Sequence, residues 1–257
     1  LVKGDIRAAN VYAGRHAKLV GGMAAGNDGS LHVSGKLRAL YLHQVTGTIG
    51  ENAVIDHQLS DCDLTVGFDL DARGATVSGG IVRVGRHAAI DVLGSGDESP
   101  TRVVIGSLGK LESLLDELHA MTPDLQADHD AKRAAIHEVE KQGQPQAEIT
   151  ELREAFQAVD DLLPRIEAGL GRVDAIRDKQ RSAKLWVTGR VLPGAVVDFG
   201  QTAVRFTEPV AGPFGLRLNG SEPVLEFPAD HDTVDLADVA EVIDGSTELA
   251  KESARAA

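Results

Sequence analysis

Residues 64–94 read LTVGFDLDARGATVSGGIVRVGRHAAIDVLG, and this stretch decides the predicted fold. Small clusters of Val, Ile and Leu recur in it every few residues, and Gly, Asp, Ser and Ala fill the gaps. The clusters are too closely spaced for helices and too regular for loops. A single strand this short cannot bury an apolar face. Stacked coils of such strands can, as in a parallel β-solenoid. Glycine at the corners adopts positive φ without a steric penalty.

The same pattern extends over residues 1–108, for which we predict a parallel β-solenoid domain. The composition agrees, because a narrow solenoid is filled by Val, Ile, Leu and Ala, and aromatic residues are only 4% of the chain. The alternative is an antiparallel β-sandwich. A sandwich favours longer alternating runs and hairpin dipeptides, and both are scarce here.

Residues 109–184 change to a helical period. Apolar residues repeat at heptad spacing with charged residues between them, which is typical of a coiled-coil seam. A short break at residues 143–145 (GQP) favours an antiparallel helical hairpin. The predicted seam consists of Leu111, Leu118, Leu125, Ile149, Leu152, Phe156, Val159, Leu163, Ile166, Leu170 and Val173.

Each helix of this hairpin contains a proline, Pro123 in the first and Pro164 in the second. Proline inside a helix removes a backbone hydrogen bond and costs about 3 kcal/mol. The two prolines are nearly equidistant from the turn, so an antiparallel hairpin sets them at similar height. We predict a shared kink at this level.

Residues 185–228 return to strand-forming sequence, and we expect these strands to cap the open edge of the solenoid. Residues 229–257 are acidic and rich in alanine. We expect a short amphipathic helix over residues 232–242, followed by a frayed tail.

Charge and composition exclude several classes of function. The net charge of −13 argues against a duplex nucleic-acid binder, which needs a basic face. The single cysteine, Cys62, excludes an intrachain disulfide framework and a cysteine-based zinc site. No apolar run reaches the length of a membrane span. The chain has no signal peptide and no initiator Met, so we expect it to begin inside a longer, cytoplasmic protein.

No reactive constellation stands out, and we predict no catalytic, cofactor-binding or metal-binding residues. The nine histidines are scattered, and no pair has HExxH spacing. An acyltransferase of the hexapeptide-repeat class remains an alternative, although its strict six-residue repeat is kept only loosely. A polysaccharide-active β-helix enzyme is a further alternative, and it requires converging carboxylates.

Several short motifs, in their order along the chain, resemble the flagellar assembly protein A (FapA) β-solenoid family. Leu192 stands where that family has an aromatic residue in its return strand. The motifs are residues 2–6 (VKGDI), 21–22 (GG), 78–81 (SGGI), 92–95 (VLGS), 101–106 (TRVVIG) and 191–200 (VLPGAVVDFG).

This resemblance implies a right-handed solenoid and a non-enzymatic role in bacterial flagellar assembly or placement. Our leading hypothesis is a cytoplasmic scaffold that binds protein partners through the acidic helical hairpin. One alternative is a bactofilin-like cytoskeletal solenoid that assembles end to end. A homodimer formed through paired hairpins is a further alternative.

Overall fold

The structure is a computed structural model, and it describes residues 1–26, 29–96, 100–106, 110–141, 164–171, 182–229, 231 and 233–245. The chain divides into two compact units. Residues Leu1–Leu108 and Lys179–Ala257 form the first, named here the β unit, and residues Gly109–Asp178 form the second, named the arm.

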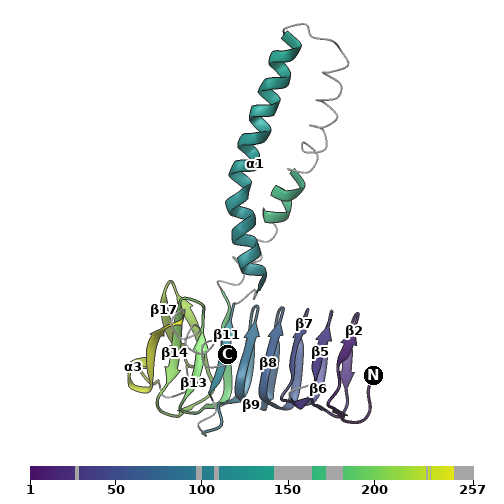
Figure 1. Cartoon of the computed structure of the whole chain (residues 1–257). Helices are drawn as coiled ribbons and strands as arrows, with labels where there is room; N and C mark the ends of the chain where they lie inside the picture. The colour runs from purple at the N-terminus through teal and green to yellow at the C-terminus, as the bar shows by residue number, and fades with distance from the viewer. Residues whose placement is uncertain are drawn as a thin grey trace. The chain divides into compact units, whose positions relative to one another are not determined.

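Most strands of the β unit belong to parallel coils that lie in a row, with β2 near the N-terminal end and β13 and β14 near the other (Figure 1). The strands before the arm are β1 (Ile6–Arg7), β2 (Val11–Ala13), β3 (Ala17–Leu19), β4 (Met23–Ala24), β5 (Ser30–Val33), β6 (Leu37–His43), β7 (Thr46–Ile49), β8 (Ala53–Val66), β9 (Leu70–Val84), β10 (Ala88–Leu93) and β11 (Thr101–Ile105). Those after it are β12 (Lys184–Val191), β13 (Ala195–Asp198), β14 (Thr202–Phe206), β15 (Val210–Ala211), β16 (Phe214–Asn219), β17 (Glu222–Glu226) and β18 (Ala240–Asp244).

Each coil bends at corners, so its successive segments lie on different flat faces of the solenoid, named here A, B and C. The inner row of face A joins Leu37, Ala53, Leu70, Ala88 and Leu185. The inner row of face B joins Met23, Leu42, Leu59, Val77, Leu93 and Val191. The inner row of face C joins Leu31, Gly47, Leu64, Val82, Val103 and Val197.

These inner rows make the core, because alternate residues of each strand point inward. The small and branched residues that the sequence supplies there are almost completely buried. The predicted parallel β-solenoid is therefore confirmed.

The corner between faces B and C requires left-handed backbone in successive coils. Gln44, Asp61 and Gly79 occupy it with φ of 51°, 53° and 67°. Glycine was expected at such corners, but the structure also places a glutamine and an aspartate there. Aspartate is among the residues that tolerate this conformation best.

The arm interrupts the solenoid without breaking its stacking. β10 pairs in parallel with β9 on one side and with β12 on the other, so Ala88 lies between Leu70 and Leu185. β11 likewise lies between β9 and β13. Strands β12 and β13, expected as part of a cap, therefore form a further coil of the solenoid.

Antiparallel strands cap this last coil. β15 and β16 pair with β12, and β14 pairs with β13. Under the cap, Arg102 and Asp198 form a buried ion pair, with Nη2 of the arginine 2.5 Å from Oδ2 of the aspartate. Arg102 also donates to the carbonyl oxygen of Gly245 at 3.2 Å. The pair joins the coil before the arm to the coil after it.

The helix predicted over residues 232–242 is shorter in the structure, so its predicted length was wrong. The structure has only the short helix α3 (Leu236–Val239), whose N-cap residue Asp235 accepts a hydrogen bond from the backbone of Ala237 at 3.1 Å. The chain then becomes extended as β18, which pairs with β14. Pairing with a strand already in place overrides the helical spacing of Leu236, Val239 and Val242.

Candidate functional site

The arm contains one long described helix, α1 (Lys110–Lys141), of 32 residues, which extends about 48 Å at 1.5 Å per residue. Residues 164–171 form a second helical segment that lies beside α1 (Figure 1). Side chains of the two segments meet, since Nε2 of Gln126 donates to Oε1 of Glu167 at 2.6 Å.

The predicted seam is only partly within the described residues. Leu170 is buried, Ile166 is half-buried, and Leu125 is exposed. His129, which the seam prediction did not include, is buried in α1. The side chains of Leu111 and Leu118, and the whole of Ile149, Leu152, Phe156, Val159, Leu163 and Val173, lie outside the described residues.

Both prolines lie in helical backbone. Pro123 is inside α1, and Pro164 belongs to the segment 164–171. The shared kink stays a prediction.

The exposed surface of α1 combines apolar and acidic side chains. Met121 and Leu125, one helical turn apart, are 57% and 36% exposed. Asp124 and Asp128 are exposed beside them, and Asp128 pairs with Lys132 at 2.6 Å. Residues spaced by four share one helix face, so the apolar pair forms a single contact surface.

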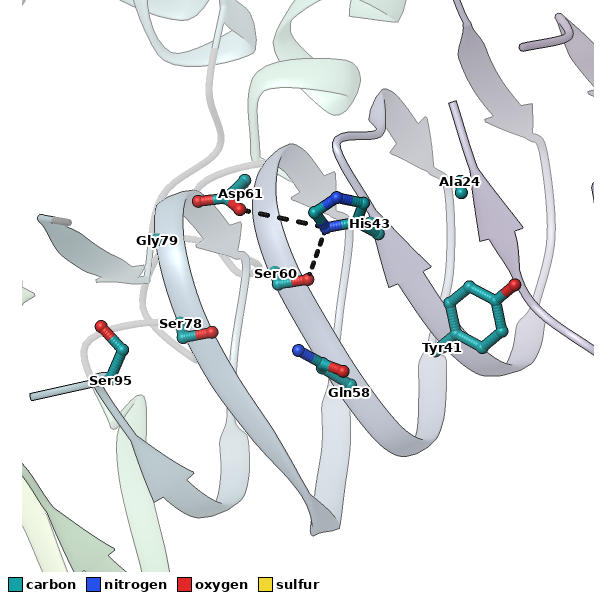
Figure 2. A pocket seen from close by; sticks show the side chains of 9 residues that line it. All are labelled: Ala24, Tyr41, His43, Gln58, Ser60, Asp61, Ser78, Gly79 and Ser95. Carbon is teal, nitrogen blue, oxygen red and sulfur yellow. Dashed lines mark hydrogen bonds and ion pairs between the residues drawn. The ribbon is translucent and has the colours of Figure 1, made fainter. Parts of the chain in front are cut away.

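The β unit has a different candidate site, a polar groove of about 530 Å³ on face B (Figure 2). Its lining combines small side chains from successive coils with larger polar ones. The groove is lined by Ala24, Tyr41, His43, Gln58, Ser60, Asp61, Ser78, Gly79 and Ser95.

His43, Ser60 and Asp61 meet in this groove but do not form a catalytic triad. The hydroxyl of Ser60 lies 2.8 Å from Nδ1 of His43, and Oδ2 of Asp61 lies 3.9 Å from the same nitrogen (Figure 2). A charge relay needs the nucleophile and the acid on opposite ring nitrogens. Both contacts involve the same ring nitrogen of His43, so these three residues do not have the geometry of a triad.

Tyr41 lies at the N-terminal end of the groove. Its ring packs directly on Gly22, where an added Cβ atom would clash with the ring. Burial, together with the nearby Asp5 carboxylate, raises the pKa of the Tyr41 phenol. Asp5 also accepts a hydrogen bond from the backbone N–H of Gly22 at 3.2 Å. The phenol thus stays protonated and donates its proton to the Asp5 carboxylate.

Nothing in the local sequence singles out this groove, because each of its residues looks like an ordinary surface side chain. A signal was nevertheless present. His43, Ser60 and Ser78 are register partners in neighbouring coils, so reading the sequence at the coil period would have aligned them.

The rest of the described chain offers little reactive chemistry. Burial raises the pKa of the Cys62 thiol to about 11, so this cysteine is a packing residue at neutral pH. Within the described residues, no group of three or more His, Cys, Asp or Glu side chains could hold a metal ion.

The model of the flagellar assembly protein A (FapA) β-solenoid domain family matches residues 1–222. The chain belongs to the FapA family. This confirms the resemblance noted in the sequence and relates the chain to flagellar assembly. Comparison with curated proteins and with solved structures gave no significant match.

The FapA match runs through the solenoid, the arm and the first capping strands. It contains both candidate sites, the face of α1 and the groove of face B. No helix in the described ranges combines the length and the apolar character that crossing a membrane requires.

Proposed function

We infer that this FapA-family chain is a non-enzymatic scaffold in flagellar assembly or placement, whose arm binds protein partners. A cytoplasmic location is part of the proposal. It rests on the lone, buried thiol of Cys62, because secreted domains more often rely on disulfides.

The solenoid supports the role of a stiff body. Its central strands are hydrogen-bonded on both sides, as β8 is to β6 and β7 on one side and to β9 on the other. The inner rows form one hydrophobic cluster that continues through β12 and β13. Motion within such a stack requires breaking ladder bonds and core contacts together.

The observation that carries the proposal is the exposed apolar pair Met121–Leu125 on α1, flanked by the carboxylates of Asp124 and Asp128. A helix face with apolar residues one turn apart is the form in which helices dock into apolar grooves of partners. The acidic flank favours a partner whose groove has a basic rim.

The groove geometry supports the non-enzymatic part. Ser60 and Asp61 both contact Nδ1 of His43, whereas in a catalytic triad the serine and the acid contact opposite nitrogens of the histidine ring. Asp61 is the only carboxylate that lines the groove among the described residues, whereas glycoside hydrolysis uses a pair.

The test compares partner binding by the full chain with binding by a variant in which a short Gly-Ser linker replaces residues 109–178. Partners are first captured with the full chain from the cells that make it, then purified, and their affinities are measured. We expect the deleted form to keep its β circular dichroism and to lose binding by roughly tenfold or more.

A matched pair of point variants sharpens the test. Met121→Glu with Leu125→Glu should weaken binding by a similar factor, roughly tenfold or more. Ala131→Glu with Ala135→Glu adds the same charge at the same spacing on exposed positions of α1 and should leave binding intact. Undiminished binding by the deleted form would refute the proposal.

Self-assembly is the second candidate function. The antiparallel strands that pair with β12 and β13 occupy the C-terminal edge of the stack, which disfavours open stacking through that end. Light scattering at several concentrations separates the cases, because filaments keep growing whereas a closed dimer reaches a plateau.

A further inference from the structure

We propose that the groove on face B binds a neutral, linear oligosaccharide, laid along the stacking direction of the coils. This site is separate from the partner surface of α1, and its test does not depend on the arm.

The groove repeats in steps along the solenoid. Ala24, His43, Ser60 and Ser78 are register partners in successive coils, and Ser95 continues the lining beyond them. Neighbouring strands are about 4.8 Å apart, so these side chains extend over roughly 19 Å. An open groove with evenly spaced polar groups suits an extended polymer of repeating units better than a compact small molecule.

The lining groups match the hydrogen-bonding character of sugars. Hydroxyl, amide, phenol and imidazole groups each both donate and accept hydrogen bonds, as sugar hydroxyls do. Here they come from Tyr41, His43, Gln58 and the serines (Figure 2). Among the described residues that line the groove, only Asp61 has a carboxylate and none is Lys or Arg. This negative charge disfavours an anionic sugar.

Tyr41 adds an aromatic surface. One face of its ring is covered by the backbone of Gly22, and the side chain is half-buried. The uncovered part of the ring can pack against the apolar face of a sugar ring, while the phenol oxygen, whose proton goes to Asp5, accepts a hydrogen bond from a sugar hydroxyl. His43 is held in place by the Ser60 hydroxyl at 2.8 Å, which reduces the entropy lost on binding.

Other polymers fit the groove less well. An extended peptide binds by adding to a free strand edge, but β8 is already paired on both sides. A nucleic acid needs Lys or Arg along its backbone, and the part of the groove lining that the structure describes contains neither.

The test uses neutral hexasaccharides of three kinds, cellohexaose, maltohexaose and chitohexaose. An acidic galacturonic acid hexamer and an uncharged Ser-Gly peptide serve as comparison ligands. Binding to the full chain is measured by saturation-transfer NMR and calorimetry at up to millimolar ligand. Gln58→Ala removes an exposed amide, and Ser78→Trp fills the groove. Thr65→Trp on face C of β8 is the matched control.

We expect at least one neutral hexasaccharide to bind, and its affinity to fall by roughly tenfold in Ser78→Trp and by less in Gln58→Ala. Thr65→Trp should bind as the parent does. All variants are first checked for parental melting, and Gln58→Ala decides the matter if Ser78→Trp melts early. The proposal is overturned if no neutral hexasaccharide binds, if the groove variants bind equally well, or if the acidic hexamer or the peptide binds instead.

Discussion

Replacing Arg102 by methionine removes the charge partner of Asp198 at the junction between the last coil and the cap. The Asp198 side chain is 0% exposed, and its Oδ2 accepts from Nε and Nη2 of Arg102 at 3.2 and 2.5 Å. Its Oδ1 accepts from the backbone of Gly200 at 2.6 Å. Without the guanidinium, a carboxylate stays buried with that single backbone donor among the contacts described.

Removing one partner of a buried ion pair destabilises a protein by about 3–5 kcal/mol. For a chain of this size, each kcal/mol lowers the melting temperature by roughly 2–4 °C. We therefore expect Arg102→Met to melt roughly 6–20 °C below the parent, measured by circular dichroism and by differential scanning calorimetry.

Two controls separate this effect from general damage. Arg38→Met breaks the exposed Arg38–Asp56 pair, with Nε 3.0 Å from Oδ2, and should cost less than about 1 kcal/mol. Adding Asp198→Leu to Arg102→Met should recover at least part of the loss, because an apolar pair can replace a buried ion pair. The reasoning fails if Arg102→Met melts no lower than Arg38→Met.

Three further predictions concern single positions. Gly47→Ala would press a Cβ against the backbone of the neighbouring coil, so it should melt well below Gly14→Ala, whose Cβ meets nothing within 4 Å. Cys62 is 1% exposed with a raised pKa, so native protein should resist thiol reagents and react at the rate of unfolding, as followed with a chromogenic disulfide. Burial lowers the pKa of His87, whose Nδ1 accepts from the backbone of Lys184 at 3.3 Å. The His87 imidazole therefore binds a proton more readily in the unfolded chain than in the folded one. The free energy of unfolding should fall as the pH drops below about 6.5. Urea titrations at several pH values should show a weaker fall in His87→Asn.

The solenoid could be predicted because its cause is local. Short apolar clusters such as Leu64 and Val66, separated by Gly and Asp, permit few other ways to bury a face. The helical period of the arm is equally local, and α1 begins and ends within the range predicted for it.

Features that depend on distant partners could not be predicted. The predicted antiparallel hairpin returns the chain to the solenoid, but Arg102 and Asp198 are 96 residues apart and no local pattern indicates that they pair. The groove depends on the register that sets His43, Ser60 and Ser78 side by side, which the apolar spacing alone leaves open. The predicted helix ends at Val239, because the next residues pair with β14 as β18.

The central structural claim is that the arm is inserted between adjacent coils of one continuous solenoid. Oγ1 of Thr188 lies 3.0 Å from Oδ1 of Asp91, although the residues are 97 positions apart. Cysteines at both positions (Asp91→Cys with Thr188→Cys) should therefore form a disulfide under mild oxidation of the folded protein, seen as faster migration on a non-reducing gel. Asp91→Cys with Thr48→Cys, on another face, should not cross-link. Failure of the 91–188 pair to cross-link while folded, or equal cross-linking of the control pair, would contradict the account.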